Sequence, residues 1–401
     1  MTQKLFAIKG VVQHYAWGGK EFIPKLLNQA PTDRPCAEYW LGAHPKASSM
    51  LANGQKLDEL ISADPANRLG VSIAQKFGRL PYLFKVLDVH DMLSIQVHPT
   101  KHEAEKGYAR ENDEDIPLDA NHRNYKDDNH KPEIMVALSE FWLLHGFKPL
   151  QELRSVLLAT PELIHLVEVL DMAGYRGLYQ SVMEESAQQT NAVLRPLIDR
   201  ILPLFEANEL KKSSPDYWAA KAYKTFCSEG DLDKGIYSIY FFNIVHALPG
   251  EAVFQDAGIP HAYMEGQNME LMANSDNVLR GGLTPKHVDV PELLKHVAFE
   301  ATIPNILKGT EQDNGIESVY QCPVPDFELS QLSLTKGQSL SKMSQTAEIL
   351  MVVEGKIKIS EQDTTVTLQK GEACVLLATA KYEISAESAT VVYRASAPVL
   401  A

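Results

Sequence analysis

Cysteine is scarce in this sequence. The chain of 401 residues has four, at positions 36, 227, 322 and 374, and no two of them form a Cys-x-x-Cys pair. So few thiols in so long a chain argue against a disulfide framework, and their wide spacing argues against an all-cysteine zinc site. We therefore expect four free thiols in a reducing compartment, and a cytoplasmic location.

Long apolar runs are also missing. No stretch approaches the about 18 consecutive apolar residues that a membrane-spanning helix needs, and the first ten residues contain no long apolar segment of the kind that marks a signal peptide. Basic residues are outnumbered, with 38 Lys and Arg against 52 Asp and Glu, which gives a formal net charge of -14. So acidic a surface argues against general binding of nucleic acids or anionic membranes. A small anionic substrate stays possible, because it needs only a few local cations.

The composition is that of a folded, globular protein, with 45% apolar and 22% charged residues. Its length predicts two or three domains. Residues 1–148 and 234–315 contain short apolar runs typical of strands, including 92–97 and the aromatic, β-branched segment 236–245. Residues 149–233 repeat apolar residues at helical spacing, which predicts an all-α insertion between two halves of a β domain. Residues 101–131 predict the start of a helix followed by a long loop.

Residues 316–401 predict a further all-β domain. Short alternating strands are separated by turns such as Glu354-Gly355 and Lys370-Gly371-Glu372, a series typical of a sandwich or jelly roll. The order of these strands and turns resembles the cupin jelly roll. The block contains no histidine, so we expect it to be a structural domain without a metal.

Four residues form the clearest candidate site: Gln96, His98, Glu133 and His261. Gln96 and His98 are two residues apart, so that on a strand their side chains point to the same face. Glu133 opens the next strand, and His261 follows a Gly-Ile-Pro turn. Imidazole nitrogens with a carboxylate or amide oxygen suit zinc or another borderline divalent ion. The spacing therefore predicts a metal site built from separate strands of one barrel.

Seven segments together resemble the type I mannose-6-phosphate isomerases (phosphomannose isomerases), in the order in which that family has them. The segments are Tyr-Ala-Trp-Gly-Gly at 15–19, Ala-Glu-Tyr-Trp-Leu-Gly-Ala-His-Pro at 37–45, Pro-Tyr-Leu-Phe-Lys-Val-Leu at 81–87, Leu-Ser-Ile-Gln-Val-His-Pro at 93–99, Asn-His-Lys-Pro-Glu at 129–133, Gly-Ile-Pro-His-Ala-Tyr at 258–263 and Ser-Asp-Asn-Val-Leu-Arg-Gly-Gly-Leu-Thr-Pro-Lys at 275–286. The resemblance spans nearly the whole chain.

The resemblance implies a mainly β protein with a helical insertion. The expected parts are a discontinuous cupin jelly-roll catalytic domain (1–148 and 234–315), an all-α inserted domain (149–233) and a C-terminal cupin-like jelly roll (316–401). It also implies one zinc ion per chain, held by Gln96, His98, Glu133 and His261. The implied activity is that of a zinc-dependent aldose–ketose isomerase that interconverts mannose 6-phosphate and fructose 6-phosphate.

Such an isomerase moves a proton between C1 and C2 of the sugar, most simply through a cis-enediol. Zinc with an open coordination position would bind the O1/O2 edge as a Lewis acid. Three residues are candidates for the proton transfer or for ring opening: Glu270, which resembles a family active-site carboxylate, Lys85 and His130. The sequence does not rank them, because it does not show which one faces C1 or C2.

The phosphate group needs cations and hydroxyls. The motif segments supply candidates of both kinds, namely Arg280, Lys286, Lys131 and Ser94. Arginine offers a bidentate fork and lysine a point charge, and Arg280 is also a candidate for stabilising charge in the transition state. Trp17 and Tyr263 are candidates for the apolar wall of the sugar pocket, with core packing as the alternative for Trp17.

Two other functions compete with the isomerase hypothesis. The first is an iron-dependent cupin oxygenase, which the glutamine in place of a first histidine disfavours. The second is a non-catalytic module that binds sugar phosphates on a retained cupin scaffold, since a fold alone does not define a function. We expect the partner to be a small sugar phosphate, with no nucleic acid and no membrane, and the chain to be a monomer.

Overall fold

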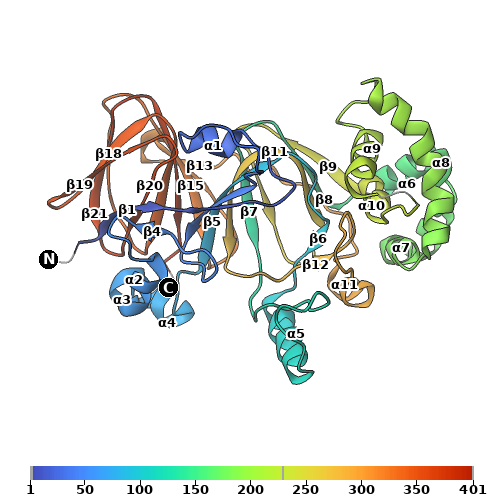
Figure 1. The fold of residues 1–401 in the computed structure, drawn as a ribbon, viewed down its shortest axis with the longest axis horizontal. Helices are drawn as coiled ribbons and strands as arrows, with labels where there is room; N and C mark the ends of the chain where they lie inside the picture. The colour runs from blue at the N-terminus through green and yellow to red at the C-terminus, as the bar shows by residue number, and fades with distance from the viewer. Residues whose placement is uncertain (1–2, 228–229, 400–401) are drawn as a thin grey trace.

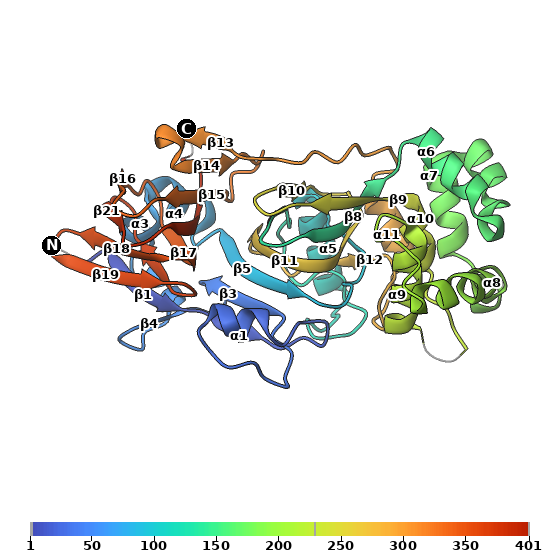
Figure 2. The same cartoon turned by 90° about the horizontal axis from the view of Figure 1, so that it is seen from above.

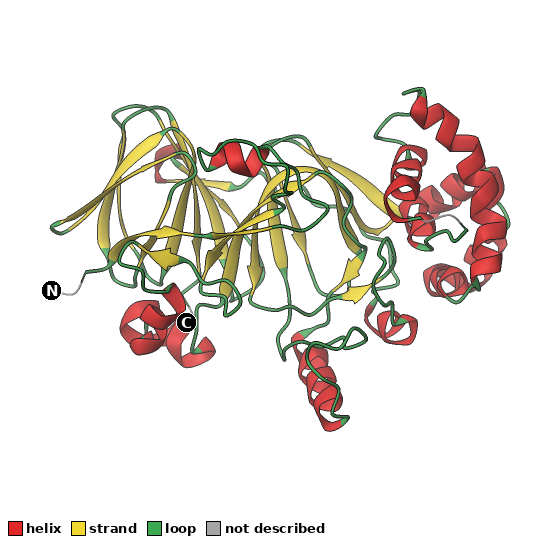
Figure 3. Ribbon diagram, in the orientation of Figure 1, coloured by secondary structure: helices red, strands yellow, loops and turns green. Residues whose placement is uncertain are grey.

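The computed structural model describes residues 3–227 and 230–399. It is mainly β, as predicted, with two barrels of strands side by side and a group of helices at one end (Figures 1 and 3). Among the described residues, no helix is both long and apolar enough to cross a membrane.

One sheet of ten strands forms the barrel that carries most of the motifs. Its strands are β2 (Val11–Gln13), β3 (Glu38–Gly42), β5 (Tyr82–Val89), β6 (Gln96–Val97), β7 (Glu133–Ala137), β8 (Phe141–Phe147), β9 (Phe242–Ala247), β10 (Ala252–Gln255), β11 (His261–Ala273) and β12 (Leu279–Arg280). Of the residues 92–97 predicted as a strand, only Gln96–Val97 form one. The prediction is wrong for 92–95, where buried Met92 and Ile95 pack in the helical core instead.

Strand β11 joins the two halves of this barrel. Its second half pairs with β5 and β7, whereas its first residues pair with β8 and β6. The pairing with β8 shifts between Tyr263 and Glu265, and Gly266 next to the shift has a φ of +124°. A Cβ at Gly266 would lie 2.5 Å from the carbonyl oxygen of Glu140. Glycine thus permits a bend that turns both halves of β11 toward one interior.

The predicted helical block is confirmed as a set of helices at the far end of the barrel (Figure 1). They are α6 (Leu150–Ala159), η1 (Pro161–Leu163), α7 (Leu166–Met183), α8 (Ala187–Glu206) and α9 (Pro215–Phe226). Helix α8 begins with a capping box, in which Ser186 and Gln189 bond each other's backbone N–H groups. Apolar side chains at helical spacing on α8, such as Leu194, Leu197 and Ile201, are fully buried.

The strand predicted over 236–245 is wrong in its first part. Residues Gly235–Phe241 form helix α10, and the strand β9 begins at Phe242. All seven residues of α10 are buried, so tertiary packing overrides the β propensity of its aromatic and branched side chains. Helix α10 thereby extends the helical core past residue 233.

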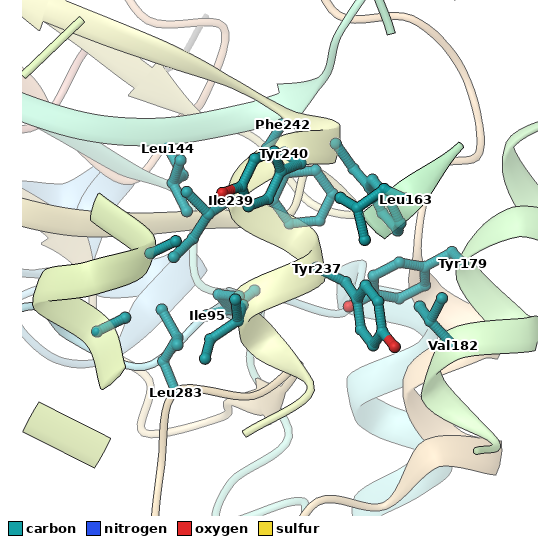
Figure 4. Packing of buried hydrophobic residues seen from close by; sticks show 14 of the residues in the cluster. Ile95, Leu144, Leu163, Tyr179, Val182, Tyr237, Ile239, Tyr240, Phe242 and Leu283 are labelled. Carbon is teal, nitrogen blue, oxygen red and sulfur yellow. The ribbon is translucent and has the colours of Figure 1, made fainter. Parts of the chain in front are cut away.

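The helices and the barrel share one apolar core (Figure 4). Tyr179 and Val182 of α7 face Tyr237 of α10, while Ile95 and Leu144 approach from the barrel. Side chains of the helices and of the barrel are fully buried in this cluster. The helical block therefore packs closely against the barrel next to β6.

The C-terminal block is the jelly roll that its strand pattern predicts, with a sheet of eight strands facing a sheet of four. The larger sheet contains β1 (Leu5–Lys9), β4 (Met50–Leu51), β13 (Thr310–Gln312), β14 (Glu317–Tyr320), β15 (Glu328–Leu334), β17 (Glu348–Glu354), β20 (Ala373–Leu376) and β22 (Thr390–Ser396). The smaller sheet contains β16 (Ser339–Met343), β18 (Lys356–Glu361), β19 (Thr364–Gln369) and β21 (Lys381–Ala386). A 3₁₀ turn, η2 (Asp313–Gly315), joins β13 to β14.

The two barrels are not separated by a linker. Strand β1 pairs with β20, with Leu5 opposite Leu376, so the N-terminus supplies a strand to the C-terminal sheet. A second apolar cluster packs the two barrels sheet against sheet, with Phe84 and Leu271 on one side and Leu329 and Ile349 on the other. The division at residue 316 stays a prediction, and the pairing of β1 with β20 means that the C-terminal sheet contains a strand from residues before 148.

The remaining helices lie on the outside of the barrels. Helices α2 (Leu57–Ala63), α3 (Pro65–Leu69) and α4 (Val71–Phe77) are below the C-terminal barrel in Figure 1, and α5 (Lys101–Asp113) and α11 (Val290–His296) are below the first. Helix α1 (Phe22–Leu26) covers the opposite side. Figure 2 shows α5 behind the first barrel when the molecule is seen from above. The helix and long loop predicted over 101–131 are confirmed.

Candidate active site

Three of the four predicted metal ligands meet inside the first barrel. His98 follows β6, Glu133 opens β7 and His261 opens β11, and one ligand atom of each lies within 4.8 Å of the others. Their exposed fractions are 0%, 4% and 3%. Segments 35 and 128 residues apart in the chain thus converge because their strands belong to one sheet.

The orientation of the two imidazole rings suits a cation. Nδ1 of His98 lies 3.1 Å from the carbonyl oxygen of Asn277, and Nδ1 of His261 lies 2.9 Å from that of Ile259. Since a carbonyl oxygen only accepts hydrogen bonds, each Nδ1 carries the proton and each Nε2 presents its lone pair. Both Nε2 atoms are buried without a hydrogen-bond partner in the described structure.

The two lone pairs point at a carboxylate. Glu133 Oε2 lies 3.6 Å from Nε2 of His98 and 3.4 Å from Nε2 of His261. Burial and the nearby charge of Lys131 lower the pKa of His98 to about 4, so the ring is neutral near pH 7. Two imidazole Nε2 atoms and one carboxylate oxygen thus converge on one point in the barrel. This donor set fits a borderline divalent ion such as zinc.

Gln96 is on the strand next to these groups. It is half-buried, and it is directly opposite His261 of β11 and Arg280 of β12 in the strand register. Side chains directly opposite one another in neighbouring strands lie on the same face of the sheet. The register therefore places Gln96 beside the cluster, and its role as the fourth ligand stays a prediction.

A second charged cluster lies deeper in the barrel. Lys85 Nζ is 3.0 Å from Glu270 Oε2 and 3.4 Å from Glu38 Oε2, and the hydroxyl of Tyr263 donates to Glu270 Oε1 at 2.8 Å. Trp40 Nε1 donates to Glu38 Oε2 at 2.5 Å. These side chains come from β3, β5 and β11, which are neighbours in the sheet. A buried lysine is thus held between two carboxylates.

The charges in this cluster stabilise one another. Burial alone would lower the pKa of Lys85, but Glu270 and Glu38 hold that pKa above its usual value. Burial raises the pKa of Glu270, against the opposing charge of Lys85. A buried carboxylate that is ion-paired to a buried ammonium group is a candidate pair for general acid–base chemistry.

The predicted phosphate-binding residues fall into two groups. Arg280 is half-buried on β12 and makes no ion pair with any residue that the structure describes, and burial lowers its pKa. Burial and the charge of Arg280 lower the pKa of Lys286, which is exposed, so these two cations are close. Ser94 is half-buried. The backbone N–H of the next residue, Ile95, donates to the carbonyl oxygen of Gly282, two residues after Arg280. Lys131 differs, because its Nζ is 2.9 Å from Glu133 Oε1.

The two aromatic candidates belong to one apolar cluster in the barrel. Tyr263 is buried and forms an edge contact with Phe141, with ring centroids 5.3 Å apart. Trp17 is half-buried against the same cluster and stacks on Tyr15, with ring centroids 5.9 Å apart. Tyr263 therefore lies beside Glu270, whereas Trp17 lies at a more open position of the same apolar cluster, and its place in the sugar pocket stays a prediction.

His130 lies apart from the metal cluster. Its Nε2 is 2.9 Å from Asp326 Oδ2, on the loop before β15 of the C-terminal jelly roll. Lys131, the next residue, points instead to Glu133. Successive side chains of an extended segment point in opposite directions. His130 and Lys131 therefore point to opposite sides, and only Lys131 reaches the metal cluster, at Glu133.

Sequence reasoning missed two residues that shape the site. Asn277 accepts the Nδ1 proton of His98 with its backbone carbonyl, and its side chain donates to the carbonyl oxygens of Asp127 at 2.7 Å and Asn129 at 2.9 Å. Asp326 orients His130 across the contact between the barrels. Asn277 lies in the motif segment 275–286, which marks its position, but a backbone acceptor leaves no mark of its role in the sequence. Asp326 lies in a part of the chain without a motif.

Fold and site together define a metal-dependent enzyme of the cupin type. Two family models match the chain: "Phosphomannose isomerase type I, catalytic domain" over residues 5–150 and "Mannose-6-phosphate isomerase, cupin domain" over residues 317–394. The chain is 38% identical to the mannose-6-phosphate isomerase of Escherichia coli (strain K12) over 92% of its length and 93% of the relative's. It is 31% identical to that of Homo sapiens over 92% of each chain.

Solved structures agree. One is the mannose 6-phosphate isomerase of Salmonella typhimurium bound to substrate (F6P) and zinc, with a TM-score of 0.88, 34% identity, and coverage of 99% of this chain and 100% of that one. A zinc-bound holo structure of mannose 6-phosphate isomerase matches with the same TM-score and 33% identity. The chain belongs to the type I mannose-6-phosphate isomerase family. The predictions of a zinc-dependent isomerase and of a cupin fold are thereby confirmed, and the oxygenase and binding-module hypotheses are set aside.

Proposed function

We propose that this chain interconverts mannose 6-phosphate and fructose 6-phosphate through a cis-enediol. The observation that supports it best is the position of the Lys85–Glu270 pair in the barrel that also carries the metal cluster. Strand β11 contributes both His261 to the cluster and Glu270 to the pair. A group that polarises a carbonyl and a group that moves a proton on the adjacent carbon are the two requirements of an aldose–ketose isomerisation.

Gln96, His98, Glu133 and His261 would hold one zinc ion per chain. When bound, zinc supplies a Lewis acid for the O1/O2 edge of the sugar. The chain's own contribution is the orientation of the ligands. The carbonyls of Asn277 and Ile259 hold both Nε2 atoms toward the site, and Lys131 occupies the oxygen of Glu133 that faces away from the histidines.

We assign the proton transfer to the Lys85–Glu270 pair. Glu270 would take the proton from one carbon and return it to the other, while Tyr263 holds the Oε1 atom of that carboxylate in place. Lys85 would neutralise the charge on Glu270 and donate to a sugar oxygen. His130 is the weaker candidate, because Asp326 already binds its Nε2.

Arg280, Lys286 and Ser94 would bind the phosphate group. Arg280 is the main phosphate ligand in this proposal, since it is half-buried, cationic and without an ionic partner in the described chain. Trp17 would pack against the apolar face of the sugar. Lys131 holds Glu133 in place, and its predicted contact with the phosphate is the less favoured role. A monomeric state and a cytoplasmic location stay predictions.

A coupled assay tests the proposed reaction. The purified chain should form fructose 6-phosphate from mannose 6-phosphate, lose this activity with a chelator and regain it when zinc is added back. Magnesium added back in place of zinc is the control, because it prefers oxygen ligands and suits this nitrogen-containing donor set poorly. Zinc-loaded protein that binds the sugar phosphate without turning it over would overturn the proposal.

Arg280→Ala tests the phosphate site. The loss of a charge-assisted bidentate contact, about 1.5–3 kcal/mol, should lower kcat/KM about 10- to 100-fold, with the zinc content unchanged. Inhibition by inorganic phosphate should weaken in parallel. Lys286→Ala is the matched comparison and should have a smaller effect, because Lys286 is exposed. A near-normal kcat/KM in Arg280→Ala would remove Arg280 from the site.

A further inference from the structure

A cavity of about 520 Å³ is lined by residues of helices α4 and α5 and by loops of both barrels. Both helices lie on the lower side of the molecule in Figure 1. We call this cavity the junction cavity. Its walls come from four separate segments: the end of α4 and the loop after it, the start of α5, the loop before β7, and the loop before β15. Its size is within the range of about 300–1,000 Å³ that is usual for small-molecule sites.

The rim of the junction cavity is basic. Lys76 and Arg79 are exposed, and neither makes an ion pair or a side-chain hydrogen bond with any residue between 3 and 399 that the structure describes. Lys101, on the opposite wall, donates to the carbonyl oxygen of Asp128 at 2.8 Å. Lys101 is also ion-paired to Glu105 and Asp128, so that Lys76 and Arg79 are the cations of the lining without an ionic partner in the described structure. Such a rim attracts a small anion, and the fork of Arg79 suits a phosphate or carboxylate group.

The floor of the junction cavity is polar and buried. His130 Nε2 binds one oxygen of Asp326 at 2.9 Å. The other oxygen, Oδ1, is buried and has no hydrogen-bond partner among the described residues, and Asp326 as a whole is 1% exposed. A buried carboxylate oxygen without a hydrogen-bond donor is unfavourable. A hydroxyl group from a ligand would satisfy it.

The cavity is also connected to the metal centre. His130 is followed by Lys131, which is 2.9 Å from Glu133 Oε1. Asn129, on the wall, accepts a hydrogen bond from the side chain of Asn277, whose carbonyl accepts from His98. A ligand that moves the segment 129–131 would therefore reach Glu133 through Lys131, and His98 through Asn277.

We propose that the junction cavity is a second binding site, for a small hydroxylated phosphomonoester, and that its occupancy changes turnover at the metal centre. Lys76 and Arg79 bind the phosphate group, and a hydroxyl of the ligand donates to Asp326. The cavity lining contains none of the proposed metal ligands, neither Lys85 nor Glu270, and none of Arg280, Lys286 and Ser94. It contains His130, the weaker of the proton-transfer candidates.

Calorimetry on the zinc-loaded, full-length chain tests the binding. Glycerol 3-phosphate is the probe, and the chain and all variants carry Arg280→Ala in addition, so that the substrate site lacks its main phosphate ligand. We expect one binding event per chain, with the affinity reduced at least tenfold in the double variant Lys76→Ala/Arg79→Ala. The control Lys358→Ala/Lys381→Ala also removes two charges, from exposed positions of the smaller C-terminal sheet, and should bind the probe normally.

The same probe tests the coupling. At saturating substrate and constant ionic strength, glycerol 3-phosphate should change kcat at least twofold in the native chain and in the control, and leave it unchanged in Lys76→Ala/Arg79→Ala. If no binding heat is seen, or if the double variant binds glycerol 3-phosphate as tightly as the chain in which Lys76 and Arg79 are intact, the proposal of a second binding site is wrong. Binding without any change in kcat would overturn the coupling. Because calorimetry needs no turnover, the binding result stands whether or not the proposed reaction is correct.

Discussion

His98→Ala should give a folded protein that has lost its zinc and, with it, almost all isomerase activity. His98 supplies one of two Nε2 atoms that face Glu133, and its Nδ1 is held by a backbone carbonyl, so no other side chain takes its position. Loss of a Lewis acid removes several kcal/mol of transition-state stabilisation, which corresponds to a fall in kcat/KM of about 10³- to 10⁴-fold. Zinc per chain, measured by elemental analysis, should fall in step.

The fold should survive this substitution. Nε2 of His98 makes no hydrogen bond within the described structure, and the barrel is held by its strand register and its apolar clusters. Near-ultraviolet circular dichroism should therefore stay native-like. His102→Ala is the matched control, since His102 is exposed on α5 and should leave zinc and activity unchanged. Full activity in metal-free His98→Ala protein would contradict the zinc-dependent mechanism.

Glu270→Gln should leave zinc in place and stop the proton transfer. Glutamine keeps the size of the side chain and can still bond Tyr263, but it cannot accept a proton from carbon. General base catalysis contributes about 10²- to 10⁴-fold, and kcat/KM should fall by that amount. Exchange of the C2 proton of mannose 6-phosphate with deuterium from solvent, followed by NMR, should slow in parallel.

A second glutamate of the same strand gives the control for Glu270→Gln. Glu265 of β11 is also ion-paired, to Lys212 and to Lys221, but it faces the helical block and not the site. Glu265→Gln should keep normal exchange and turnover. If Glu270→Gln retained more than about a tenth of the native kcat/KM, the effect would be below the usual range for a general base, and the assignment to Glu270 would be wrong.

Local patterns predicted the parts of the structure that depend on nearby residues. Helical spacing over 149–233 and alternation after 316 correctly predicted the helical block and the C-terminal jelly roll. The prediction failed at Gly235–Phe241, where β-branched and aromatic residues form a helix because all of them are buried against α7 and the barrel. Propensity is a local quantity, and burial on every side overrides it.

The same distinction applies to the site. His98, Glu133 and His261 were predicted from motifs, and the structure brings them together. Whether Lys131 faces a substrate or Glu133, and whether His130 faces the metal or Asp326, depends on which side of one extended segment each residue occupies. That alternation is decided by the pairing of β7 with β10 and β11, which comes from distant parts of the chain.

The sequence by itself therefore pointed to the family, the cupin architecture and the residue types of the metal cluster, because these depend on motifs and periodicity within short segments. Zinc, as distinct from other borderline divalent ions, was implied only by the resemblance to the family. Tertiary structure alone decided the ion pair of Lys85 with Glu270 and Glu38, the entry of β1 into the C-terminal sheet and the existence of the junction cavity. Each of these depends on the register of strands far apart in the chain. Such register comes from the packing of whole sheets against one another, and no local segment encodes it.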